Sequence, residues 1–130
     1  MSEKENWIQR VFDDPYVLEN MPDHYQTTKV VEYAIEEDSS LFSFVREDLK
    51  NFDLCEYAIE LSPWNIEFVP TKYKTKELCE LALSKDITVL PEVPPSFVSE
   101  EMYEKAYNEG EELQKIIPST IKKKFTNKGE

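Results

Sequence analysis

Four glutamates recur at a constant interval of 24 residues: Glu32, Glu56, Glu80 and Glu104. Two carboxylates that converge on a substrate can act as general acid and base. However, acidic side chains number 27 among 130 residues, so the sequence singles out no such pair. The chain also has one histidine, no CxxC, no Gly-rich phosphate loop and no cluster with metal-ligand spacing. We therefore expect no catalytic residue, no cofactor and no metal, and a protein that is not an enzyme.

The interval that spaces these glutamates holds for the whole chain. Cutting the sequence after Asp14 gives four full units without a gap: residues 15–38, 39–62, 63–86 and 87–110. Residues 1–14 form a half unit that we expect to cap the N-terminal end, and residues 111–130 form a partial unit with a basic tail. Such a period is typical of units that stack because none can bury its apolar face alone. We predict a single domain over residues 1–130.

The positions within each unit are numbered 1 to 24, and their residue types predict two helices. An N-cap residue type precedes position 1, and a proline at position 8 ends a first helix of about seven residues. A second cap at position 13 starts a second helix of about ten residues, whose apolar positions 16, 17, 20 and 21 form one stripe. The predicted fold is all-α, a short-period α-solenoid of two-helix repeats. Arg46 replaces the proline in the second unit, and residues 121–130 lose the pattern and are expected to fray.

The two cysteines occupy the same position in consecutive units. Cys55 and Cys79 are each the second residue of an apolar pair in the stripe. Equivalent positions on packed neighbouring helices lie about 8–10 Å apart. That separation is too large for a disulfide, so we expect two buried free thiols that act as small hydrophobic residues.

The third unit carries a resemblance to a known family. Phe68-Val69-Pro70, a spacer and then Thr-Lys-Glu-Leu-Cys-Glu-x-Ala-Leu over residues 75–83 resemble a short-repeat domain family of unknown function. Tandem arrays of that family occur in bacterial, phage and large-virus proteins, and the resemblance covers roughly residues 15–121. It implies a helical-repeat fold. It implies no catalytic residues, because the residues that recur in the family match the structural positions described above.

The second helices carry the residues that we expect to face a partner. Carboxylates at positions 18 and 22 lie on the solvent side of the helix. Position 18 is about 130° from the centre of the apolar stripe. Tyrosine and leucine fill position 19 on the opposite flank, where aromatic rings beside carboxylates are typical of an interface. Trp64 at position 2 can join them. The candidate partner-binding residues are Glu32, Tyr33, Glu36, Glu56, Tyr57, Glu60, Trp64, Glu80 and Leu81. Two alternatives remain open: a solvated acidic face, and rings that pack on the neighbouring unit.

Charge sets the class of partner. The net charge of −12 excludes direct binding to nucleic acid or to an anionic membrane, because both need a positive surface. No stretch approaches the ~20 apolar residues of a membrane span, and the polar start MSEKENWIQ lacks a signal-peptide core. These features favour a cytoplasmic protein.

Two functions fit these observations. The first is a non-enzymatic protein–protein interaction module that presents an acidic and aromatic helical-repeat surface to a protein with a basic surface. The alternative is a small acidic inhibitor that mimics nucleic acid, of the kind a phage encodes against a host defence enzyme. Residues 1–112 hold 26 acidic and 10 basic side chains, and such a surface can occupy a groove that normally binds phosphates.

Overall fold

The computed structural model describes residues 2–126, and every regular element within that range is a helix. The all-α prediction is confirmed. The α-helices are α1 (Glu3–Asp13), α2 (Thr28–Glu37), α3 (Phe52–Leu61), α4 (Lys76–Lys85), α5 (Glu100–Glu109), α6 (Glu111–Gln114) and α7 (Ser119–Thr126). The 3-10 helices are η1 (Pro15–Asn20), η2 (Asp23–Tyr25), η3 (Ser39–Phe44), η4 (Glu47–Leu49), η5 (Pro63–Phe68), η6 (Thr71–Tyr73), η7 (Ile87–Glu92) and η8 (Pro95–Phe97). Residues 127–130, which end the predicted basic tail, lie outside the described residues, as does Met1.

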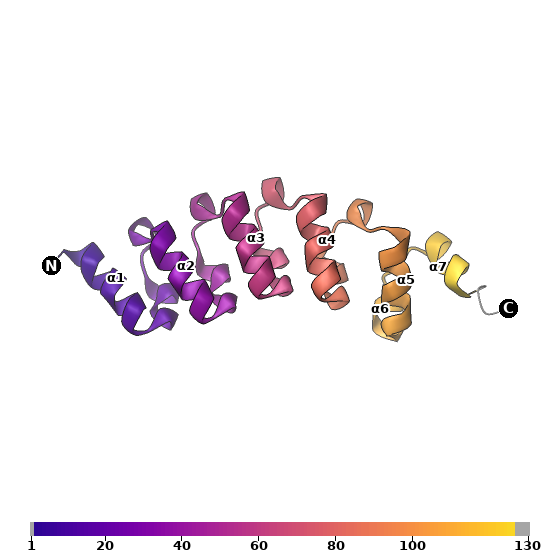
Figure 1. The fold of residues 1–130 in the computed structure, drawn as a ribbon, viewed down its shortest axis with the longest axis horizontal. Coiled ribbons are helices and arrows are strands. Elements are labelled where there is room, and N and C mark those ends of the chain that lie inside the picture. Colours follow the sequence, from indigo (N-terminus) through magenta and orange to yellow (C-terminus); the bar gives the residue numbers. More distant parts are fainter. Residues whose placement is uncertain (1, 127–130) are drawn as a thin grey trace.

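The same three elements recur in the four full units. A six-residue 3-10 helix covers positions 1–6, a three-residue 3-10 helix covers positions 9–11, and a ten-residue α-helix covers positions 14–23. Figure 1 shows α2 to α5 side by side in chain order along the longest axis, with the two termini at opposite ends. Elements equivalent in sequence are therefore neighbours in space.

The first helix of each unit differs from the sequence prediction. It is a 3-10 helix of six residues, and a further 3-10 turn follows it where only a connection was expected. The cap before position 1 and the proline at position 8 leave room for fewer than two α-helical turns. The tighter 3-10 turn closes its hydrogen bonds over three residues, so such a short segment satisfies more of its backbone groups.

The second unit ends its first helix without a proline. Arg46 has the extended backbone that the prolines have elsewhere, with φ −62° and ψ 144°. Its N–H, which proline lacks, donates to Gln26 Oε1 over 2.8 Å. Gln26 of the preceding unit thus occupies the Arg46 N–H, so this group is unavailable to continue the helix. As a result η3 ends at Phe44, at the same position as η1 and η5.

The predicted caps at position 13 are confirmed in all four full units, and those before position 1 are confirmed in three of the four. Each α-helix from α2 to α5 begins after a residue whose side-chain oxygen accepts an N–H of the first turn: Thr27, Asn51, Thr75 and Ser99. Three aspartates accept in the same way at the start of the six-residue 3-10 helices: Asp14, Asp38 and Asp86. Ser62 forms no such side-chain bond, and η5 begins with Pro63, whose fixed φ suits the first helical position.

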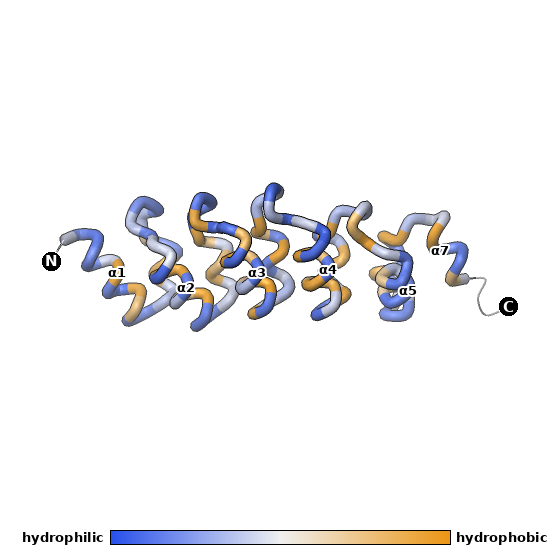
Figure 2. Tube along the Cα trace, turned by 45° about the horizontal axis from the view of Figure 1, so that its top comes forward, coloured by the Kyte–Doolittle hydropathy of each residue, from blue (hydrophilic) through white to orange (hydrophobic). Residues whose placement is uncertain are grey.

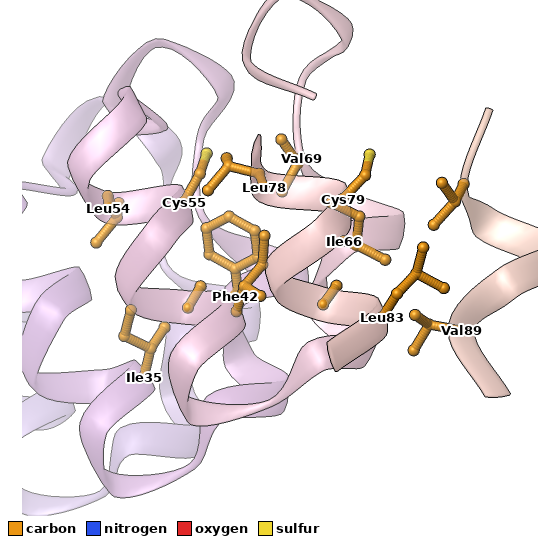
Figure 3. Packing of buried hydrophobic residues seen from close by; sticks show 14 of the residues in the cluster. Ile35, Phe42, Leu54, Cys55, Ile66, Val69, Leu78, Cys79, Leu83 and Val89 are labelled. Atoms are coloured by element: carbon orange, nitrogen blue, oxygen red, sulfur yellow. The ribbon is translucent and has the colours of Figure 1, made fainter. Parts of the chain in front are cut away.

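The core lies between two layers. Helices α1 to α5 form one layer, which we call the α layer, and η1, η3, η5 and η7 form the other, which we call the 3-10 layer; successive members of the 3-10 layer contact one another. The predicted apolar stripe faces this boundary, and Cys55 and Cys79 are fully buried free thiols within it, as predicted. In Figure 3, Phe42 projects from η3 among apolar side chains of the α-helices. Figure 2 shows the apolar segments recurring along the length of the chain.

The last unit corrects one prediction. Residues 121–126 were expected to fray, but they continue the helix α7. The Phe125 side chain is buried, with its ring centroid 5.6 Å from that of Tyr107, and Lys124 Nζ lies 3.2 Å from Glu100 Oε2. The lysine run of this segment interrupts the apolar stripe, which is why fraying was expected. One buried ring and one ion pair to α5 nevertheless keep the segment helical.

Candidate interaction surface

The predicted carboxylates lie on the outer side of the α layer. Glu32, Glu36 and Glu60 are exposed, and Glu56 and Glu80 are partly exposed. Glu80 lies 3.9 Å from Lys76 Nζ on the same helix, a surface pair of little energetic weight. These five residues make the outer α surface acidic, in the place that the sequence predicted for them.

The predicted tyrosines and leucine at position 19 lie between units. Tyr33 is half-buried, its ring centroid is 4.7 Å from that of Phe12, and its hydroxyl donates to the Phe12 carbonyl over 3.2 Å. Tyr57 and Leu81 are half-buried against the core. Burial raises the pKa of the Tyr57 hydroxyl, and the nearby charges of Glu36 and Glu32 on α2 raise it further. This geometry supports the alternative in which the position-19 side chains pack on the preceding unit.

Trp64 lies apart from those residues, in the 3-10 layer. Its ring is 41% exposed, and its indole N–H donates to Asp86 Oδ2 over 3.2 Å. Tyr16, 48 residues earlier, has a ring that is 58% exposed and a hydroxyl that donates to Asp38 Oδ2 over 2.7 Å. The two aromatic side chains are thus held by the same contact, each to the aspartate that ends its own unit and caps the first 3-10 helix of the next one.

Both aspartates keep their negative charge over an extended pH range. The hydroxyl of Ser40 donates to Asp38, and this bond, followed by those from Tyr16 and the Ser40 backbone, holds the pKa of the carboxyl below its usual value. The hydroxyl and backbone of Thr88 lower the pKa of Asp86 in the same way, with a smaller effect from Trp64. The carboxylate beside each exposed ring is therefore ionised at neutral pH.

A second carboxylate accompanies each ring. Glu19 and Glu67 follow the aromatic residue by three positions, and a 3-10 helix has three residues per turn, so ring and carboxylate lie on one side of the helix. Both glutamates are exposed, and neither forms an ion pair within residues 2–126. We call these groups the Tyr16 site (Tyr16, Glu19, Asp38) and the Trp64 site (Trp64, Glu67, Asp86).

Two further aromatic rings are exposed at position 6 of the 3-10 layer. Phe44 and Phe68 are each 38% exposed. The Phe44 carbonyl accepts from Gln26 Nε2, and the Phe68 carbonyl accepts from Lys50 Nζ, each over 2.9 Å. Gln26 and Lys50 are buried at the same position of consecutive units. These buried polar side chains link the first unit to the second and the second to the third, and they fix the backbone that carries the exposed rings.

A shallow hollow marks the junction of the fourth and fifth units. It has a volume of about 430 Å³ and is lined by Thr88, Glu109, Gly110, Glu111, Glu112 and Leu113. Thr88 and Gly110 occupy the positions that Tyr16 and Asp38 hold at the first junction. The hollow therefore lies where the first junction holds a ring and a carboxylate.

The groups that could perform chemistry are few within residues 2–126. No three residues among His, Cys, Asp and Glu converge in a way that could hold a metal ion. Burial raises the pKa of the Cys55 thiol to about 11, and it raises that of Cys79 too, so neither is a reactive thiolate at neutral pH. In the same range no helix is long and apolar enough to cross a membrane.

Comparison of the chain with protein-family models, curated proteins and solved structures found no match.

The sequence carried a signal for the two sites that the 24-residue register conceals. Residues 15–19 read PYVLE and residues 63–67 read PWNIE, while the corresponding residues 39–43 and 87–91 read SSLFS and ITVLP. The outer face of the 3-10 layer thus alternates between units. Tyr16 holds the position of Trp64 two units earlier, and Glu19 and Glu67 repeat three residues after them.

Proposed function

We propose that this protein is an α-solenoid that acts as a non-enzymatic protein–protein interaction module. The observation that carries the proposal is the pair of exposed aromatic side chains, Tyr16 and Trp64, each held by a hydrogen bond to the aspartate that ends its own unit. A ring that is fixed before binding loses little conformational freedom when it is buried by a partner. Exposed tyrosine and tryptophan are also the residues that most often dominate binding energy at interfaces.

The solenoid half of the proposal is supported by the recurrence of elements. The same helices begin and end at the same positions of each full unit, and the contacts between units join neighbours in chain order. An array of this kind offers an extended surface in place of a pocket. The resemblance to a short-repeat family remains part of the proposal.

The acidic outer face of the α layer supplies a second contribution. Glu32, Glu56 and Glu80 recur on successive helices and are exposed or partly exposed. Such a row attracts a basic surface over about one Debye length and speeds encounter more than it adds affinity. The partner that we infer is therefore a protein whose contact surface is basic.

Affinity capture with variants of each face tests the proposal. The first bait combines Tyr16→Ser with Trp64→Thr, which are the residues that Ser40 and Thr88 provide at the same position in the other units. The second bait combines Glu32→Gln, Glu56→Gln and Glu80→Gln. We expect the first variant to lose a partner that the wild-type protein retains, and the second to keep it with slower association. Circular dichroism checks that both variants stay folded.

Two other outcomes would contradict the proposal or favour the alternative function. Retention of every partner by the first variant would refute the surface assigned here. Loss of the partner by the second variant alone, with competition by DNA or RNA, would favour the nucleic-acid-mimicking inhibitor in place of the interaction module.

A further inference from the structure

The Tyr16 site and the Trp64 site share one chemical design. In each, an exposed aromatic side chain donates to the aspartate that ends its unit, and a glutamate follows it by one 3-10 turn. The face of an aromatic ring attracts a cation through its quadrupole, and adjacent carboxylates add direct Coulomb attraction. The combination suits a cationic side chain better than it suits an apolar or acidic one.

Each aspartate retains hydrogen-bonding capacity toward the ring. Oδ1 of Asp38 accepts both the N–H and the hydroxyl of Ser40, while Oδ2 accepts only the hydroxyl of Tyr16. A carboxylate has about four acceptor sites, two on each oxygen, so one site on Oδ2 stays open beside the ring. The Trp64 site repeats this arrangement, since Thr88 donates twice to Oδ1 of Asp86 and Trp64 donates once to Oδ2.

Arginine fits these sites better than lysine. A planar guanidinium stacks on a ring while its N–H groups donate to a carboxylate in the ring plane or beside it, whereas an ammonium acts as a point charge. The molecule already contains such a contact, because the guanidinium carbon of Arg10 lies 4.1 Å from the centre of the Trp7 ring. Within residues 2–126 no arginine or lysine of the chain forms an ion pair with the carboxylates of either site.

The distance between the sites sets the spacing of the cations. The two sites lie two units apart, and packed helices are about 8–10 Å from axis to axis, so the separation is about 16–20 Å. An extended chain rises about 3.3 Å per residue and directs every second side chain to the same side. Two side chains six residues apart therefore span about 20 Å and face the same way.

We propose that the Tyr16 and Trp64 sites together bind two arginine side chains, six residues apart, on one extended segment of the partner protein. This inference rests on the proposed function and names the chemistry of the partner. The sites differ in one neighbour: the residue before the aspartate is Glu37 at the Tyr16 site and Lys85 at the Trp64 site. The Tyr16 site is consequently the more acidic and contributes the larger share of the salt-dependent attraction.

Titration of fluorescent synthetic peptides against the full chain tests the proposal. One Gly/Ser peptide carries two arginines six residues apart, a second carries one arginine, and a third carries two lysines at the same positions. We expect the two-arginine peptide to bind about 10 to 100 times more tightly than the one-arginine peptide, because the second contact forms at high effective concentration. The lysine peptide binds more weakly than the two-arginine peptide.

Single variants localise the effect. Tyr16→Ser and Trp64→Thr should each reduce the affinity for the two-arginine peptide to that for the one-arginine peptide. The matched control is Phe44→Asn, which removes an exposed ring outside both sites and installs the residue that Asn20 provides at the same position. This control should leave the affinity unchanged.

Equal affinities for the one- and two-arginine peptides, or an equal loss in the control variant, would overturn the proposal. So would a failure of the two-arginine peptide to bind at low salt. Partner capture that is still lost in the Tyr16→Ser, Trp64→Thr protein would then show that the interaction surface stands while its assignment to arginines fails.

Discussion

The outer face of the α layer and the outer face of the 3-10 layer repeat with different periods. On the α-helices, glutamate returns in every unit at the position of Glu32, Glu56 and Glu80. On the 3-10 helices, Tyr16 and Trp64 alternate with Ser40 and Thr88, so the pattern returns only in every second unit. Both faces belong to units with the same backbone elements.

This difference shows which side chains are needed to form a unit and which are not. Ser40 and Thr88 donate to the capping aspartates, and their units form the same helices as the units that carry the rings. The rings are therefore not required to build a unit. A glutamate that recurs in every unit, by contrast, is also explained by its favourable helix propensity, so its recurrence alone says less about a partner.

The largest loss of stability is expected on the buried side of a 3-10 helix. Phe42 is fully buried, whereas Phe44, two residues later in η3, is 38% exposed. We expect Phe42→Ala to lower the free energy of unfolding by about 3–5 kcal/mol through the cavity it leaves. Phe44→Ala should cost about 1 kcal/mol or less, because little apolar area leaves the core. Urea denaturation measures both, and equal losses would contradict the assignment of inner and outer faces.

A smaller effect is expected at the polar link between units. Lys50 is buried and donates to the Phe68 carbonyl. Lys50→Met removes that donor, which should cost about 1–3 kcal/mol for the carbonyl left without a partner. Lys74 occupies the same position one unit later and is only half-buried, so Lys74→Met is the matched control and should have little effect. Thermal unfolding of the two variants compares them directly, and a larger loss in the control would disprove the link.

The aspartates of the 3-10 layer should make stability depend on acid pH. The pKa values of Asp38 and Asp86 are lower in the folded chain than the value of about 3.9 expected when unfolded. Their contribution is therefore present above the unfolded pKa and is lost as the pH falls through the folded pKa.

Replacing both aspartates tests this sign. Asparagine is also a good N-cap, so the Asp38→Asn, Asp86→Asn protein should fold. Compared with the wild type, its melting temperature should fall less between pH 6 and pH 3. Parallel pH profiles for the two proteins would show that the 3-10 face contributes nothing to the acid response.

The smallest effect is expected on the outer α surface. Within residues 2–126, Glu80 alone among Glu32, Glu56 and Glu80 has an ion pair, and its Oε1 is 3.9 Å from Lys76 Nζ. We expect the protein with Glu32→Gln, Glu56→Gln and Glu80→Gln to have nearly the wild-type free energy of unfolding. Each substitution should change it by about 0.5 kcal/mol or less. Calorimetry at two salt concentrations checks this, and a large loss would mean that the acidic face is structural.

The sequence determined most of the fold because short-range rules apply. The caps at Thr27, Asn51, Thr75 and Ser99 and the apolar stripe both follow from the spacing within one unit. The 3-10 geometry of the first helix was not predicted, because N-cap and proline signals mark where a helix begins and ends without fixing the number of residues in each turn.

The buried polar links were also missed. Gln26 and Lys50 occur in connecting segments, where a polar side chain is normally solvated. Only the approach of the next unit gives them a carbonyl to bind. The Tyr16 and Trp64 sites were missed for a related reason, since the ring and the aspartate of each site are 22 residues apart and the sites recur only in every second unit. Trp64 alone was among the predicted residues, and its partner Asp86 was interpreted only as a cap.

The short range of these contacts also bears on how the chain folds. Among the side-chain hydrogen bonds within residues 2–126, the longest in sequence joins Asn65 to the Ser39 carbonyl, 26 residues away. Loop-closure entropy rises with the length of chain that must be closed, and proteins rich in local contacts fold rapidly. Because the side-chain contacts within residues 2–126 join segments that are close in sequence, we expect folding to begin at a central unit and to advance one neighbour at a time.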